Sequence, residues 1–260
     1  LFSLFANILL FCMYIHNWVC SLPFCACLLF KYLILHKHCK VKKKNIISHD
    51  NLKLKHYLCS MNSQPENSIR MSENIVVADA DYLDSVVFDL IVNFERMIGR
   101  PLPKADLSQW AVCMALDGGV RAGKNDVQVV LVHDEKHKEM DNFKPSNYEH
   151  DLHARAFSDD YLGEFTITSV ALGDAISKEE YFENVLHTLL DHKEVHRIML
   201  VPDSEHGDAY DRIRHLLQRV DDDNKRITLF AMQPMEGGNF RQEILGYSLM
   251  NALGIKAEEI

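Results

Sequence analysis

The chain has 260 residues and a formal net charge of −9, but the charge is spread unevenly along it. The residues before position 73 carry nine Lys or Arg and two Asp or Glu, whereas those from 73 onward carry 19 and 35, a net charge of −16. Such acidity argues against a broad surface that binds nucleic-acid phosphates. Six of the seven cysteines lie in the first 60 residues, so the acidic part has one cysteine and no intrachain disulfide.

The first 72 residues form an apolar and basic head. Residues 1–35 are almost continuously apolar and residues 36–44 are basic, a pattern typical of a membrane anchor with a cytoplasmic flank. The alternative is translated upstream sequence or a mis-called start, because the head lacks helical or strand periodicity and starts are available near its end, at Met61 and Met71. We expect the second case, in which residues 73–260 are a single cytoplasmic domain with no membrane contact.

The domain begins with a run that ends in aspartates. Residues 75–78 are β-branched or small and apolar, and Asp79 and Asp81 follow directly. Apolar residues then recur every three or four positions from 83 to 98, and Gly99 follows. The sequence therefore predicts a buried strand that leads into an amphipathic helix.

Strands and helices are expected to alternate through the rest of the domain. Further strands are predicted over 110–116, 127–133, 165–172, 197–201 and 226–232. Helices are predicted around 148–157, after the capping box at 177–180, and over 208–220 and 240–253. This alternation predicts an α/β fold, a three-layer sandwich with a mainly parallel, Rossmann-like sheet of about six strands.

Acidic side chains follow three of the expected strands. Asp79 and Asp81 follow the first, Asp174 follows the strand at 165–172, and Asp203 and Asp208 follow the strand at 197–201. Because the carboxyl ends of parallel strands meet at one edge, these carboxylates are expected to converge and to hold Mg²⁺ or Mn²⁺. Alternatively, each acid caps a helix or closes a turn.

These motifs resemble the PIN/NYN-type nuclease domains. Those domains carry an acidic residue after the first strand and a hydrophobic strand followed by a Ser-Gly-Asp-x-Asp-like turn, and residues 198–208 here read Ile-Met-Leu-Val-Pro-Asp-Ser-Glu-His-Gly-Asp. The turn lacks the Ser-Gly-Asp order, and residues 110–133 look like an insertion. Over residues 74–232 the resemblance implies metal-dependent RNA cleavage by Asp79 or Asp81, Asp174, Asp203 and Asp208. The domain also resembles an uncharacterised bacterial family of unknown function, which implies no activity.

A second resemblance concerns the same first strand. Asp79-Ala80-Asp81 is similar to the nucleophile motif of haloacid-dehalogenase-type phosphatases. That resemblance implies that Asp79 attacks phosphorus and that Asp81 is the general acid. The motif expects Thr or Val where Leu83 stands, and no isolated lysine before a late acidic pair is evident.

Two glycine-containing segments are candidates for anion binding. Residues 118–125 are one residue short of a phosphate-binding P-loop, and a flexible loop is the alternative, in which Arg121 and Lys124 still contact an anion. Gly237 and Gly238 are expected at the start of the last helix, where they form an anion nest or an ordinary cap. That helix is apolar on more than one face, so it packs deep in the domain or mediates a homodimer.

Two function classes follow from these patterns. One is a metal-dependent, nuclease-like enzyme that hydrolyses RNA phosphodiesters with an acidic site at the strand ends. The other is a non-catalytic α/β module for binding or assembly. Whether the carboxylates converge in space discriminates between them.

Overall fold

The computed structural model describes residues 71–218, 220 and 224–260. Both interpretations of the head therefore concern a segment that, apart from Met71 and Ser72, lies outside the described residues. Within the described part of the chain, none of the helices has the length and apolarity that a membrane span requires.

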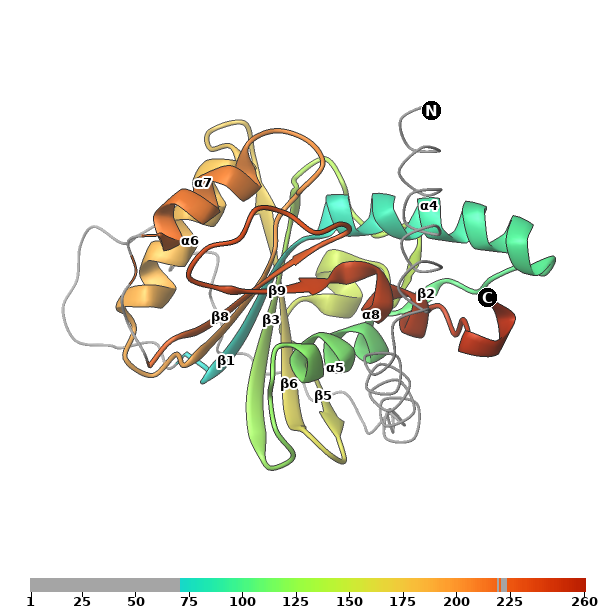
Figure 1. The fold of residues 1–260 in the computed structure, drawn as a ribbon, viewed down its shortest axis with the longest axis horizontal. Coiled ribbons are helices and arrows are strands. Elements are labelled where there is room, and N and C mark those ends of the chain that lie inside the picture. The colour runs from blue at the N-terminus through green and yellow to red at the C-terminus, as the bar shows by residue number, and fades with distance from the viewer. Residues whose placement is uncertain (1–70, 219, 221–223) are drawn as a thin grey trace, which may run out of the picture. The chain divides into compact units, whose positions relative to one another are not determined.

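A seven-stranded sheet forms the centre of the domain (Figure 1). Its strands are β1 (Asn74–Asp79), β3 (Asn125–Asp134), β5 (Arg155–Asp159), β6 (Gly163–Leu172), β7 (Arg197–Val201), β8 (Arg226–Ala231) and β9 (Arg241–Ile244). They lie in the order β5-β6-β3-β1-β7-β8-β9, and every pair is parallel except β5 with β6. A separate pair, β2 (Ala105–Asp106) and β4 (Phe143–Lys144), is also parallel.

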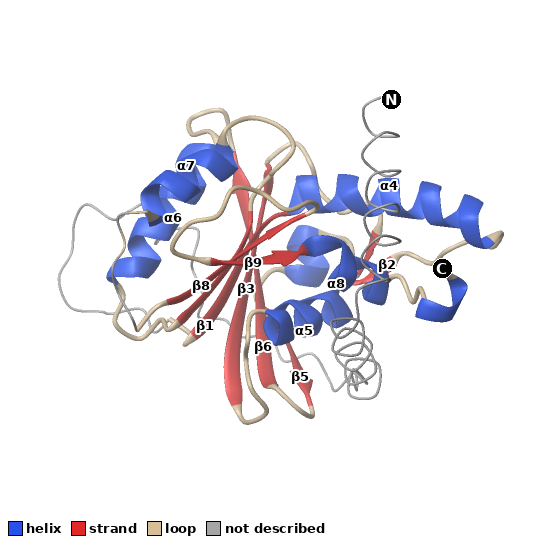
Figure 2. Ribbon diagram, viewed as in Figure 1, coloured by secondary structure: helices blue, strands red, loops and turns tan. Residues whose placement is uncertain are grey.

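Helices cover both faces of this sheet (Figure 2). They are α4 (Ala80–Ile98), α5 (Leu107–Asp117), α6 (Lys178–Asp191), α7 (Ala209–Leu217) and α8 (Leu245–Ala252), with a π-helical turn η1 (Tyr148–Leu152) and a 3₁₀ turn η2 (Ala257–Glu259). Helix α6 contacts α7 on one face, and α5 contacts α8 on the other. The predicted three-layer α/β class with a mainly parallel sheet is confirmed.

The core on the α6 and α7 side joins both helices to the central strands. Phe182 and Ile213 of the helices are almost completely buried and belong to one cluster with Ile75, Val77 and Leu200 of the sheet. Strand β1 lies at the centre of the sheet with helices over both of its faces, and all six of its residues are buried. This explains why its sequence is continuously apolar rather than alternating.

The chain changes direction in the sheet after β6. From β1 it moves outward through β3 to β6, and then it crosses back to place β7 on the other side of β1. In open α/β sheets the carboxyl ends of the two strands at such a switch point form the usual ligand crevice. Here those strands are β1 and β7.

The strand predicted at 110–116 is wrong, because these residues lie in α5. Asp106 caps that helix, and its Oδ1 accepts hydrogen bonds from the Ser108 and Gln109 amides at 2.9 and 3.2 Å. The helix is covered by the sheet on one side and by α8 on the other, so residues 110–115 are all buried. A helix buried on all sides loses the periodicity that distinguishes it from a buried strand.

Two other predicted helices also differ. The segment 148–157 forms only the turn η1 and then β5, which adds an antiparallel edge to the sheet. The last helix begins at Leu245 rather than near Phe240, because Arg241–Ile244 pairs with β8 as β9. Both errors lie at sheet edges, where pairing with a neighbour decides the backbone conformation.

Candidate functional site

Asp79 ends β1 at the switch point and begins α4. Its Oδ1 accepts hydrogen bonds from the backbone amides of Asp81 and Tyr82, both at 3.1 Å. A carboxylate at this position satisfies N–H groups that the first helical turn leaves without a partner. Asp79 is only 3% exposed, so its carboxylate is enclosed by the fold.

Lys178 links the two carboxylates that follow β1. Its Nζ lies 2.6 Å from Asp79 Oδ1 and 2.7 Å from Asp81 Oδ2. Lys178 is the first residue of α6, whose N-cap is Ser177. The connection from β6 to β7 thus brings an ammonium group to the carboxyl edge, between two acids of a distant segment.

Burial and charge act in opposite directions on the pKa values of the trio formed by Asp79, Asp81 and Lys178. Burial raises the pKa of Asp79, although the nearby Lys178 ammonium works against it. Burial also opposes the charged form of Asp81, but hydrogen bonds from Lys178, the Asp134 amide and His137 outweigh it and lower the pKa of Asp81. The two carboxylates outweigh desolvation at Lys178 and raise its pKa, so the ammonium stays charged.

The end of β3 supplies the remaining partners of Asp81. The Asp134 amide donates to Asp81 Oδ2 at 2.8 Å, and His137 Nδ1 lies 2.7 Å from Asp81 Oδ1. Nearby, the buried His133 ring stacks on Tyr148, with ring centroids 3.7 Å apart and planes 5° apart. Burial lowers the pKa of His133, which favours the neutral imidazole. The Asp134 amide and His137, together with Lys178, thus occupy both oxygens of Asp81.

The turn after β7 is folded around Asp203. Asp203 Oδ1 accepts hydrogen bonds from the Glu205 and His206 amides at 2.9 Å each, and His206 Nδ1 lies 3.1 Å from Oδ2. This turn is tied to α4, because the Tyr82 hydroxyl lies 3.1 Å from Ser204 Oγ. Asp203 thus lies at the strand end next to Asp79, but its carboxylate closes its own turn.

The other two predicted acids lie in exposed ion pairs. The Asp174 side chain is 95% exposed, and Lys136 Nζ is 3.4 Å from its Oδ1. Asp208 is the N-cap residue of α7, but its side chain accepts no hydrogen bond from a helix amide; its Oδ2 accepts one from Arg212 Nε at 2.9 Å. Neither joins the trio around Lys178.

This donor set does not fit the predicted divalent cation. Mg²⁺ and Mn²⁺ require several oxygen ligands that face one position. In the part of the chain that the structure describes, no three His, Cys, Asp or Glu side chains are grouped to hold a metal ion. Between Asp79 and Asp81 the positive charge is supplied by the Lys178 ammonium instead.

The predicted anion-binding residues lie away from this edge. Arg121 and Lys124 are exposed in the loop between α5 and β3, at the amino ends of the strands. The loop is closed by Asn125, whose Nδ2 donates to the Arg121 and Leu162 carbonyls at 2.8 Å, so no helix follows as a P-loop requires. Gly237 and Gly238 lie in the exposed connection from β8 to β9, and their predicted place at a helix start is wrong.

Sequence reasoning overlooked Lys178, Tyr82 and His137. The capping box at 177–180 predicted a helix start, and the topology of a parallel sheet places a helix that precedes a strand with its amino end at the carboxyl edge. That combination was the signal for Lys178. Tyr82 and His137 carry no comparable signal, because their positions depend on the turn after β7 and on the loop after β3.

Fold and site together define an open, mainly parallel α/β domain whose switch-point carboxylates are held by a lysine. The chain belongs to the family of unknown function DUF6621, whose model matches residues 68–260. No curated protein and no solved structure matches the chain.

Proposed function

We propose that this chain is a non-catalytic α/β binding module rather than a metal-dependent nuclease. The observation that supports this proposal is the position of Lys178, whose ammonium lies within 2.7 Å of a carboxylate oxygen of both Asp79 and Asp81. A lysine so placed neutralises the acids that a nuclease would use to bind its cation. The trio then ties β1, α4 and α6 together at the carboxyl edge.

Charge and burial support a structural role for the trio. Asp79 is enclosed and caps α4, so a metal ion would have to displace Lys178 from a half-buried site and leave its ammonium without a partner. The cation would therefore compete with an ammonium group that is already within hydrogen-bond distance of both carboxylates. A net charge of −16 over residues 73–260 also disfavours binding of the RNA backbone.

Cleavage of single-stranded RNA by the full chain, with Mn²⁺ or Mg²⁺, tests this proposal. We expect no cleavage above buffer and no saturable Mn²⁺ binding by calorimetry, in the wild type and in Asp79→Asn alike. Asp174→Asn is the matched control, since it removes an equal charge from a fully exposed carboxylate. Mn²⁺-dependent cleavage that Asp79→Asn abolishes and Asp174→Asn retains would overturn the proposal in favour of the nuclease.

The same lysine favours a second candidate, a haloacid-dehalogenase-like phosphatase. The nucleophile motif that Asp79-Ala80-Asp81 resembles is accompanied by a lysine before an acidic pair. The sequence did not make that lysine evident, but Lys178 precedes Glu179 and Glu180 and contacts both aspartates. Hydrolysis of p-nitrophenyl phosphate with Mg²⁺ tests it. Hydrolysis that Asp79→Asn abolishes and Asp174→Asn retains would favour this candidate over the non-catalytic module. Absence of hydrolysis in the wild type would exclude this candidate for simple phosphate monoesters.

A further inference from the structure

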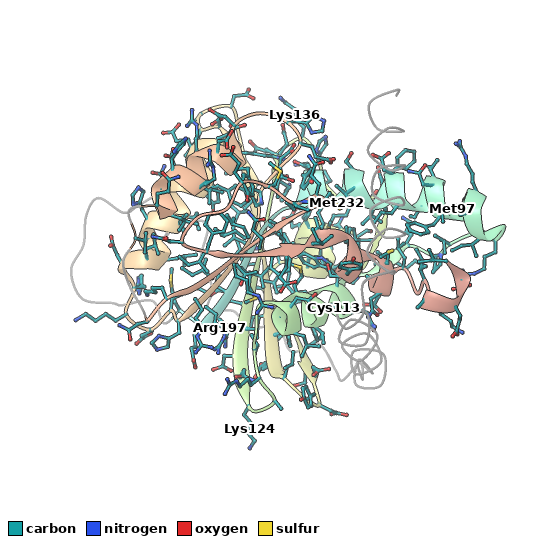
Figure 3. All side chains as sticks on the ribbon, in the orientation of Figure 1. Met97, Cys113, Lys124, Lys136, Arg197 and Met232 are labelled. Carbon is teal, nitrogen blue, oxygen red and sulfur yellow. The ribbon has the colours of Figure 1, made fainter. Side chains whose placement is uncertain are left out.

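Arginines gather at the amino edge of the sheet, opposite the site around Lys178. Arg197 and Arg226 begin β7 and β8 and are direct partners in the parallel register, so their side chains leave the sheet on the same face. Arg241 begins β9 and pairs with Thr228, two residues beyond Arg226, on that face as well. Figure 3 shows Arg197 and Lys124 at one end of the sheet and Lys136 at the other.

The loop after α5 lies against this edge. A side-chain carbon added at Gly118 would lie 2.2 Å from Met199 Sδ, so the loop packs directly on β7. A carbon added at Gly119 would lie 3.8 Å from Arg241 Nη1. Arg121 follows two residues further on in this loop, close enough to Arg197 for its positive charge to lower the pKa of Arg197.

Arg197 is the enclosed member of this cluster. Its side chain is 15% exposed, its Nη1 donates to Asn74 Oδ1 at 3.3 Å, and its buried Nε has no hydrogen-bond partner. Glu73 Oε1 is 3.9 Å from Nη1, beyond hydrogen-bond distance. Arg197 is thus held against the sheet by Asn74, and a ligand at this edge would meet the end of its guanidinium group rather than the buried Nε.

Among the residues that the structure describes, Glu73 is the carboxylate beside Arg197, and the neighbouring charges of Arg226 and Arg121 are positive. Burial, and then the positive charges of Arg226 and Arg121, lower the pKa of Arg197, while Glu73 works against them. Arg241 pairs with Glu243, but among the described residues neither Arg121 nor Arg226 forms an ion pair with a carboxylate. Like charges at this distance repel one another, and a bound anion would relieve the repulsion.

We propose that Arg121, Arg197 and Arg226 form a binding site for the phosphate group of a small ligand. Guanidinium groups recognise phosphate oxygens through paired, charge-assisted hydrogen bonds, and a tetrahedral dianion can accept from three of them. The acidity of the domain restricts the site to one or a few phosphates, because an extended polyanion would meet acidic surface beyond it. This site lies at the opposite edge from Lys178 and does not depend on whether that site is catalytic.

Calorimetric titration of the full chain with inorganic phosphate and with adenosine monophosphate, at low ionic strength, tests the proposal. We expect saturable binding that Arg226→Gln weakens about tenfold, the usual effect of losing one charged hydrogen bond. Arg226 is exposed, so its substitution leaves the fold intact. Arg96→Gln is the matched control, because Arg96 is an exposed arginine in the last turn of α4.

Each other outcome contradicts the proposal. If neither probe binds saturably, or if Arg226→Gln and Arg96→Gln weaken binding equally, the three arginines do not form a phosphate site. Binding of a single-stranded oligonucleotide without binding of the mononucleotide would show that the ligand is a polyanion and would contradict a site for a small ligand. These titrations contain no divalent cation and measure binding rather than cleavage, so failure at this edge is distinguishable from failure of the function proposed above.

Discussion

One ammonium group serves two carboxylates at the end of β1, and Asp79 depends on it more than Asp81 does. Asp81 also accepts hydrogen bonds from the Asp134 amide and from His137. Asp79 is more deeply buried, and Lys178 is its partner of opposite charge. An enclosed carboxylate that loses its cation keeps its desolvation penalty and loses the compensating attraction.

Lys178→Gln is therefore expected to lower the free energy of unfolding by about 2–3 kcal/mol at pH 7. Urea denaturation followed by circular dichroism measures the change. Adding Asp79→Asn to Lys178→Gln should recover part of the loss, because it removes the unpaired buried charge. Lys136→Gln is the control, since Lys136 and Asp174 are 74% and 95% exposed and their pair should contribute less than about 0.5 kcal/mol. Equal losses for the two lysine variants would contradict the role assigned to Lys178.

The acids of this edge could be predicted from their own positions after the strands, whereas the cation required the sheet topology as well. Asp79 and Asp203 directly follow apolar strands, so their edge was evident from the sequence. Lys178 stands in a first helical turn beside Glu179 and Glu180, where a charged residue usually faces solvent. Its contact with Asp79, 99 positions earlier, follows only from the order of the strands.

At the scale of elements, the hairpin from β5 to β6 depends on a glycine. Gly163 has a φ of +106°, and a Cβ there would lie 2.4 Å from the Asn125 carbonyl oxygen on the neighbouring β3. Gly163→Ala is expected to lower the free energy of unfolding by about 3 kcal/mol through backbone strain and collision. Gly237→Ala should change it by less than about 0.5 kcal/mol, because nothing lies within 4 Å of that position. Thermal and urea unfolding of both variants test this contrast.

The C-terminal turn η2 is tied to the end of α4 by a pair that responds to pH. Arg100 donates to both oxygens of Glu259, at 2.8 and 2.9 Å, and these bonds with that of the Lys256 amide lower the pKa of Glu259 to about 2. Because this pKa is depressed, the contact is fully present above the ordinary value of 4.5 and is lost as the pH falls toward 2. Arg100→Gln should raise the pKa of Glu259 toward its ordinary value.

Carboxyl-carbon NMR of Glu259 measures that titration. Arg96→Gln, which removes an arginine from the last turn of α4, should leave it unchanged. A Glu259 titration that is the same in the wild type and in Arg100→Gln would contradict the pairing.

Element type was predictable wherever one pattern dominated. Strands β1, β3, β6, β7 and β8 were identified because short β-branched runs lie between turn residues. Helix α5 was not, since its residues 110–115 are all buried and an unbroken apolar run fits either a strand or an enclosed helix. Asp106 as N-cap was the local feature that distinguished the two.

At the scale of the whole molecule, the class of fold followed from the alternation of strands and helices, but the arrangement of the edges did not. The antiparallel β5 and the short β9 exist because β6 and β8 offer unpaired backbone groups to them. The same long-range order brings Asp79, Asp81 and Lys178 together at one edge and Arg197 and Arg226 together at the other, which neither the net charge nor a local motif reveals. The two proposed sites are therefore properties of the topology rather than of any local motif.

The topology also bears on the expected homodimer through the last helix. Leu245, Leu249 and Leu253 are fully buried within the chain, and α8 contacts α5, so the apolar surface that suggested a partner is covered internally. Tyr247, 41% exposed, is the large apolar residue that α8 leaves at the surface. We therefore expect α8 not to mediate a dimer.

Sedimentation equilibrium of the full chain at micromolar concentration checks this expectation. The mass should not depend on Tyr247, so Tyr247→Lys should sediment like the wild type, at 30.0 kDa if no other surface associates. Tyr161→Lys is the control, because Tyr161 is equally exposed in the turn between β5 and β6. A particle of twice the chain mass that Tyr247→Lys dissociates and Tyr161→Lys preserves would show that α8 is an interface. In that case the single exposed aromatic ring, rather than the buried leucines, would be its centre.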